Sequence, residues 1–509
     1  SMRCLFTLDL NGSRLNYGKQ GKTLRNAVRD SFVFALPRAQ KSNFLTACGV
    51  VVQQVGIMSG MVAGLQSKDS VIKFTDNQIS WLASSIHGTC LCGFALAAVV
   101  TEKFGRRQAL SLLTAPVIIH WLVLYFEQRF AIWMASTVML GICFGGVMSL
   151  GLMSIAEYTS PSIRGTCLSF IISGGPAVGM TIAHVLSTIM DWRVVALIGL
   201  IPTTLSAIVP CLWIESPTWL ASKGRFQECE RAFKALQGHS KKAEKELQLL
   251  IEVEKCKRLK LSRETSATVF HKLLTAMRQK YFWKIAMIVC VLHVYRVTGG
   301  KILFTTFTIT ILQDITGSSD LFLYTMLVDG FLIIGCAMSC YFNSKANVRT
   351  VLLCSGILAI IILFALSACL FFKPPGDARF IWLSCCLLAL YYVTAYAGLF
   401  PVIETLFAEI FPLELKMYCL FGFGTIGSGL LFLSLQPALS MFSALGYHGV
   451  FLLNAVLSML CLFYLWWYLP ETKGRTLQEI ELYFKNGTFD NVKLDGEQFQ
   501  VLLREDVKV

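Results

Sequence analysis

Four ionisable side chains lie inside strongly apolar stretches of this sequence, where little water is available to solvate a charge. They are Arg296, Lys301, Asp329 and Glu404. Burying one charge at the centre of a membrane helix costs roughly 3 kcal/mol on insertion scales, so such residues persist when they are paired or functional. The four charges sum to zero, and the sequence therefore predicts that they compensate one another.

Three hypotheses follow from these four charges. In the first, they form an internal ion-pair network that is mainly structural. In the second, Arg296 or Lys301 contacts an anionic or strongly polar solute, and Glu404 is its counter-ion. In the third, Glu404 or Asp329 exchanges a proton during transport, as intramembrane carboxylates do in proton-coupled carriers.

Further polar residues are candidates for contacts with a solute. These candidates are Gln53, Gln54, His293, Tyr295 and Thr298. The two glutamine amides would suit hydroxyl groups, because an amide both donates and accepts hydrogen bonds. His293 lies within one helical turn of Arg296 and shares its helix face. For His293 and the glutamines, helix packing is the alternative interpretation.

The composition indicates a membrane protein. Of 509 residues, 55% are hydrophobic and 15% are charged, whereas soluble domains have about 25% charged residues. The net charge of +14 does not favour nucleic-acid binding, because the basic residues lie between apolar runs. The cysteines lie mostly in apolar runs without metal-site spacing, so no metal or cofactor is expected. No nucleophile–base set or phosphate loop indicates an enzyme.

Twelve apolar runs are long enough to cross a bilayer, whose core needs about 20 residues per helix. They lie near 43–66, 79–101, 108–126, 130–156, 166–188 and 193–214, and near 283–312, 321–342, 350–372, 379–408, 417–443 and 447–469. The predicted fold class is an all-α membrane protein with twelve transmembrane helices in two six-helix halves. Such repeats typically place a solute site between them, near the membrane midplane.

The polar segments divide the chain into five predicted parts. These are an N-terminal tail (1–42), a first half (43–215), a linker of short helices (216–282), a second half (283–470) and a C-terminal tail (471–509). The basic loops fall on one side of the membrane, which puts both termini and the linker in the cytosol by the positive-inside rule. The plasma membrane is the expected location.

Four charged motifs follow apolar runs at the predicted membrane boundaries. They are Glu102-Lys-Phe-Gly-Arg106-Arg107, Glu157 with Arg164-Gly165, Glu215-Ser-Pro-Thr-Trp-Leu220, and Leu469-Pro-Glu471-Thr-Lys-Gly474. Together they resemble the sugar porters of the major facilitator superfamily, in particular the insect facilitated trehalose transporter-like branch. The resemblance covers about residues 45–482.

This resemblance implies a cytosolic gate in which arginines pair with acids on neighbouring helix ends. The gate residues that it assigns are Glu102, Arg106, Arg107, Glu157, Arg164, Glu215, Glu409, Lys416 and Glu471. It also implies transport of a hexose or trehalose-like sugar by alternating access. The first apolar run has no acid of the kind typical of proton-coupled members, which favours facilitated diffusion.

The sequence departs from the family pattern where the sugar should bind. The family has Gln-Gln-x-x-Gly-x-Asn in its seventh helix, and here Tyr295, Arg296 and Lys301 replace the amides. Two alternatives therefore stay open: the same fold carrying a non-sugar, anionic solute, and a transporter-like sensor that no longer transports. The expected partners are a small-molecule solute and membrane lipid, with no nucleic acid and no obligate protein partner.

Overall fold

The computed structural model describes residues 58–66, 72–158, 174–237, 277–318, 320–372, 377–411 and 416–473, with a few further positions at 244–255 and 480–484. Every regular element in these ranges is helical. Eight of the described helices are long and apolar enough to cross a bilayer, and two shorter apolar helices accompany them. Each of the twelve predicted runs contains described helix. The predicted all-α membrane fold is thereby confirmed.

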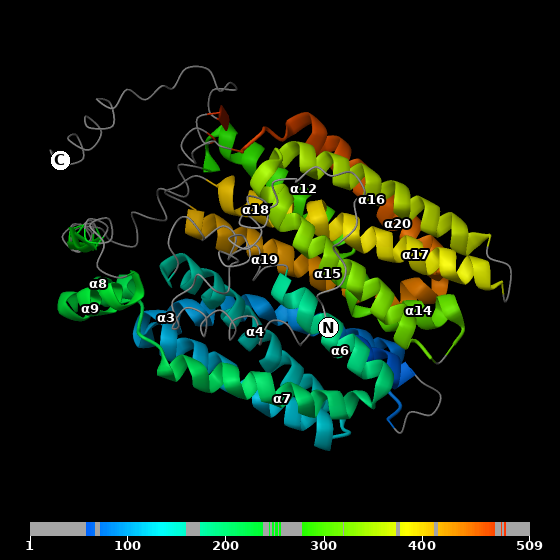
Figure 1. Cartoon of the computed structure of the whole chain (residues 1–509), viewed down its shortest axis with the longest axis horizontal. Helices are drawn as coiled ribbons and strands as arrows, with labels where there is room; N and C mark the ends of the chain where they lie inside the picture. The colour runs from blue at the N-terminus through cyan, green and yellow to red at the C-terminus, as the bar shows by residue number, and fades with distance from the viewer. Residues whose placement is uncertain are drawn as a thin grey trace, which may run out of the picture.

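The first half forms one bundle, drawn in blue to green in Figure 1. Its elements are α3 (Asp76–Phe126), α4 (Phe130–Tyr158), α6 (Gly175–Ile189), α7 (Trp192–Ile208) and the 3-10 turn η2 (Val209–Leu212). Helix α3 begins at Asp76 because Thr75 and Gln78 form a reciprocal capping box. It contains two spans, which meet at Gly105, where φ is +85°.

Two short helices follow the first bundle and lie beyond the ends of the long helices in Figure 1. They are α8 (Pro217–Ser222) and α9 (Phe226–Gln237). The Ser216 side chain caps α8. Their buried faces form a small core of their own around Leu220, Cys229 and Phe233. These helices lie within the predicted linker, whose described part is mainly helical with a short turn between α8 and α9.

The second half forms the other bundle, drawn in green to red. Its elements are α12 (Lys280–Thr298), α13 (Lys301–Thr306), α14 (Thr308–Thr316), α15 (Phe322–Lys345), α16 (Val348–Phe371), α17 (Ala378–Thr394), the π-helical turn η3 (Ala395–Leu399), α18 (Phe400–Glu409), α19 (Lys416–Leu435) and α20 (Ala438–Tyr468). The π turn precedes Pro401, which lacks the N–H that a regular α-helix needs at that position.

The two bundles meet along two seams. Helix α6 packs against α15 on one seam, and α3 packs against α19 and α20 on the other. The second seam carries a hydrogen bond in which the Ser84 hydroxyl donates to the Gln436 side-chain oxygen at 2.8 Å. In transporters built from two such halves, the solute site typically lies at the interface between them.

Two predicted boundaries are wrong. The run predicted at 417–443 is interrupted, because α19 ends at Leu435 and helix resumes at Ala438. Pro437 separates the two helices, because proline disfavours helical backbone at the preceding residue. Helix α20 has a kink at Gly446, where φ is +68°, and the last predicted run, 447–469, follows that kink. The run predicted at 283–312 is not one helix but three, since the chain breaks at Gly299–Gly300 and again at Phe307.

Candidate functional site

The break between α12 and α13 brings Arg296 and Lys301 to one side of the bundle. On a continuous helix, residues five apart point about 140° away from each other. Gly300 has φ of +70°, a left-handed conformation that favours glycine, and it turns the chain between the two cations. The Tyr391 hydroxyl donates to the carbonyl oxygen of Gly299 and ties the break to α17.

Both cations contact the same carboxylate oxygen of Glu404 on α18. Arg296 Nη1 lies 3.2 Å from Glu404 Oε1, and Lys301 Nζ lies 3.1 Å from it. The side chains keep 13–18% of their exposure, so they are largely but not completely buried. We call these three residues the charge cluster. Sequence analysis grouped them with Asp329, and the structure brings only these three together.

Aromatic rings support the charge cluster. The Arg296 guanidinium lies 5.9 Å from the centre of the Phe407 ring, and Lys301 Nζ lies 5.8 Å from that of Phe400. Cations at this range gain from the negative face of the ring. His293 stacks on Phe407 at 4.2 Å, so it flanks the cluster without an ion pair.

Two other candidates on α12 point away from the charge cluster. The fully buried Tyr295 side chain points at α16, where its hydroxyl lies against Gly356. Thr298 accepts a hydrogen bond from Ser458 of α20 at 3.1 Å. Both residues therefore pack the second bundle in this structure. Gln53 and Gln54 lie outside the described residues.

Asp329 has a different partner from the one its charge suggested. Its Oδ2 lies 2.8 Å from Nδ1 of His184, and both side chains are fully buried. His184 belongs to α6 of the first half and Asp329 to α15 of the second. The contact is therefore a polar bridge between the bundles. Sequence analysis did not pair these residues, and 145 positions separate them along the chain.

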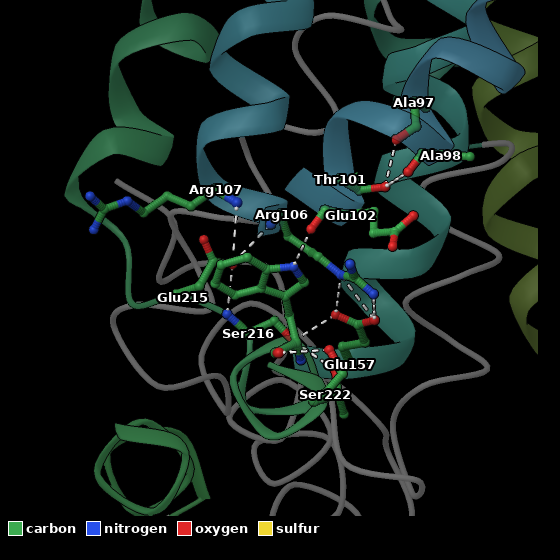
Figure 2. Close-up of polar contacts among 12 residues, drawn as sticks. Ala97, Ala98, Thr101, Glu102, Arg106, Arg107, Glu157, Glu215, Ser216 and Ser222 are labelled. Carbon is green, nitrogen blue, oxygen red and sulfur yellow. Dashed lines mark hydrogen bonds and ion pairs between the residues drawn. The ribbon is translucent and has the colours of Figure 1, made fainter. Parts of the chain in front are cut away.

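The predicted gate residues of the first half form a second polar network, at the bundle end near α8 (Figure 2). Arg106 binds the Glu157 carboxylate through both Nε and Nη2, with Nη2 2.6 Å from Oε1. The Ser216 hydroxyl donates to the other oxygen of Glu157 at 2.6 Å. Bidentate guanidinium–carboxylate pairs are among the stronger polar contacts in proteins. This pair joins the start of the second span of α3 to the end of α4.

Glu215 caps the second span of α3. Its Oε1 accepts hydrogen bonds from the backbone N–H groups of Arg106 at 2.9 Å and Arg107 at 3.4 Å. A carboxylate stabilises a helix start because the first N–H groups there have no partner within the helix. Arg107 in turn donates to the carbonyl oxygen of Trp213 at 2.9 Å. The segment that follows α7 and η2 and the start of this span are thus joined by hydrogen bonds donated and accepted on both sides.

Gly105 makes this cap possible, and Gly105→Ala should lower thermal stability. A side chain there would adopt a strained left-handed backbone, costing about 1–2 kcal/mol, and its Cβ would overlap the Glu215 carboxylate. Gly317→Ala is the matched control, because Gly317 has φ of +64° and open space around it. Thermal melting in detergent, monitored by size-exclusion chromatography, should show a larger loss of stability for Gly105→Ala than for Gly317→Ala. Equal losses would contradict the role of the cap.

The second half repeats the cap but not the clamp. The Glu471 carboxylate accepts from the N–H groups of Val348 at 3.0 Å and Arg349 at 3.1 Å, at the start of α16. Arg349 also donates to the carbonyl oxygen of Trp466, as Arg107 does to that of Trp213. By this correspondence Val348 takes the place of Arg106. The second bundle therefore has no guanidinium at the position that clamps Glu157 in the first.

The remaining gate candidates are less informative. Glu102 exposes its carboxylate, and its carbonyl oxygen accepts from the Trp219 indole at 3.3 Å. Glu409 ends α18 and Lys416 begins α19, but the Lys416 side chain is outside the described part of the chain. Arg164 is also outside the described residues. The gate contacts given above each stay within one half.

Among the described residues, no group of three or more His, Cys, Asp or Glu side chains could hold a metal ion. Sequence analysis missed two contributors to the polar sites. Ser216 completes the shell of Glu157, and its place in the Glu-Ser-Pro motif was a usable signal. His184 is buried in an apolar segment, and only the packing of α6 on α15 shows its partner.

Comparisons with known proteins agree with these features. The family model for "Sugar (and other) transporter" matches residues 38–484. The chain is 24% identical to Sugar transporter ERD6-like 6 of Arabidopsis thaliana, covering 90% of this chain and 92% of that protein. It is 23% identical to the facilitated trehalose transporter Tret1 of Drosophila virilis, covering 80% of this chain but 44% of that protein.

The solved structures support the same fold. The proton:xylose symporter XylE bound to 6-bromo-6-deoxy-D-glucose has a TM-score of 0.68 with 18% identity, covering 90% of this chain and 100% of that one. An inward-open structure of XylE from E. coli also has a TM-score of 0.68, with 17% identity. The resemblance predicted from the four motifs is thereby confirmed, and the two-bundle architecture is the major facilitator fold.

Proposed function

Because this chain belongs to the sugar transporter family of the major facilitator superfamily, we propose that it is a facilitative transporter of a hexose or trehalose-like solute that works by alternating access. The members of this family are transporters and not enzymes. The single observation that carries the proposal is the pair of facing interrupted helices, α12–α13 and α17–α18. Carriers typically bind their solute where membrane helices are interrupted near the midplane.

In our proposal the polar groups at these interruptions face the solute. The Gly299–Gly300 break and the π turn η3 lie on helices joined by the Tyr391–Gly299 hydrogen bond. The charge cluster lies beside them and keeps some exposure. Ionisable residues inside membrane segments commonly mark a solute or ion pathway.

Alternating access requires two rigid bodies that rock against each other. The Arg106–Glu157 clamp and the Glu215 and Glu471 caps each join elements of one half, which suits rigid-body motion. The seams carry few polar contacts among the described residues, chiefly Ser84–Gln436 and His184–Asp329. In our proposal both termini and α8–α9 face the cytosol, and the protein works at the plasma membrane.

Counterflow in proteoliposomes tests this function. Vesicles preloaded with unlabelled glucose or trehalose, or with a sugar acid, should take up the matching labelled solute transiently, saturably and without a pH gradient. A proton ionophore should leave the exchange unchanged, because we propose facilitated diffusion. Protein-free vesicles are the control. Uptake no faster than in these vesicles for every solute would refute transport, and collapse by the ionophore would refute facilitation.

A further inference from the structure

The charge cluster contains more positive than negative charge. Arg296 and Lys301 share a single oxygen of Glu404, at 3.2 and 3.1 Å. One carboxylate neutralises one cation, so the three side chains sum to +1. Within the described residues, neither cation forms an ion pair with any other acid. The sequence-based expectation of neutrality depended on Asp329 as a fourth member.

Asp329 cannot supply the missing charge. Its carboxylate is fully buried against His184, with Oδ2 2.8 Å from Nδ1. It belongs to the contact between α6 and α15, and no contact to Arg296 or Lys301 is found among the described residues. The Asp329 carboxylate, which the sequence suggested as a counter-charge for the two cations, therefore has its partner elsewhere in the fold.

The cations retain hydrogen-bonding capacity. A guanidinium carries five N–H donors, and only Nη1 of Arg296 bonds to Glu404. The Nε of Arg296 is buried and has no hydrogen-bond partner in the described structure. Lys301 uses one contact of three available donors. The rings of Phe407 and Phe400 lie at cation–π range and offer no acceptor oxygen.

An uncompensated charge in a membrane segment is unfavourable. A solute with one negative charge would remove that cost and would give the free donors an acceptor. Arginine is suited to planar carboxylates, which it binds with two parallel hydrogen bonds. A neutral sugar would leave the excess positive charge in place, and a dianion would give the site a net negative charge.

We propose that the solute recognised at the charge cluster is a monoanion with a carboxylate, a hydroxylated ring acid of the hexuronate type. This inference rests on the proposed function and narrows its solute class. In it, Arg296 and Lys301 bind the solute carboxylate while Glu404 holds the two cations in position. Hydroxyl groups of the ring remain for neutral partners.

Counterflow with three labelled probes tests the charge rule. D-glucose, D-glucuronate and D-glucose 6-phosphate share a ring and differ at C6 by a charge of about 0, −1 and −2. Glucuronate should exchange at least about tenfold faster than the other two in the wild-type protein. Equal rates for glucose and glucuronate, or a faster rate for glucose, would overturn the inference while leaving transport intact.

Charge variants give the second arm. Lys301→Gln makes the cluster neutral, so the glucuronate-to-glucose ratio should fall at least about tenfold. Glu404→Gln makes it +2, so the phosphate should gain relative to glucuronate. Lys284→Gln, which removes an exposed lysine of α12, the helix that carries Arg296, should leave the ratio unchanged. Ratios that do not follow the cluster charge would overturn the inference.

A binding measurement distinguishes failure of this inference from failure of the proposed function. Thermal stabilisation of the detergent-purified protein reports binding without flux. If glucuronate stabilises it and no probe exchanges, the inference stands and transport is refuted. If glucose stabilises it more than glucuronate, or if neither does, the inference is overturned whatever the flux.

Discussion

Asp329→Leu should destabilise the protein by about 3 kcal/mol, which is the largest stability loss that we expect from a single residue of the polar sites. The substitution leaves the His184 imidazole fully buried without its partner at 2.8 Å. Removing one member of a buried polar pair costs the desolvation of the other, about 3–5 kcal/mol when the pair is charged. Thermal melting in detergent, monitored by size-exclusion chromatography, should show this loss of stability.

The double variant His184→Leu/Asp329→Leu should regain most of that stability. Replacing both members of a buried pair by apolar residues is often neutral or stabilising. Asp320→Leu, which removes an exposed acid before α15, is the control and should cost below about 1 kcal/mol. A double variant as unstable as the single one would contradict this account of the bridge.

The same double variant also tests whether the solute pathway includes His184 and Asp329. Both side chains are fully buried, so a solute could not contact either one in this conformation. Counterflow should therefore stay within about threefold of wild type. Loss of exchange in a stable double variant would place the bridge in the transport cycle. That result would revive the hypothesis of a transporting role for Asp329.

The parts of the site that were predictable from sequence are those set by local pattern. Arg296, Lys301 and Glu404 are charges in apolar runs, and compensation of charge already suggested their contact. The family resemblance implied that gate arginines pair with acids at neighbouring helix ends, and Arg106–Glu157 is one such pair. Among the span ends that the structure describes, apolar length placed most to within a few residues, except where Pro437 and the Gly299–Gly300 break intervene.

What could not be predicted depends on packing between distant segments. Sequence shows that Asp329 needs a partner, but only the contact of α6 with α15 selects His184 over Arg296. Similarly, Glu215 is recognisable as a motif acid. Its role as a cap arises because the end of α7 meets the start of a span 109 residues earlier. Charge balance alone therefore gave the wrong membership of the cluster.

Arg106→Gln should reduce turnover about tenfold with little change in the half-saturation concentration. Arg106 and Glu157 keep 15% exposure each and form a bidentate contact, so their pairing should contribute about 2 kcal/mol. The Arg106–Glu157 pair holds the first bundle rigid at one end. The pair makes no contact with the charge cluster of the second bundle. Initial rates of counterflow over a range of solute concentrations separate the two kinetic effects.

A double-mutant cycle isolates the clamp. Arg106→Gln, Glu157→Gln and the combined variant should give a coupling energy of about 2 kcal/mol in thermal stability. Val348→Gln is the matched control, because Val348 has the same cap contact in the second half without a clamp. It should leave turnover near wild type. Both substitutions keep the backbone N–H that the cap uses. If Val348→Gln slows exchange as much as Arg106→Gln, loss of the clamp is not the cause of the slower turnover.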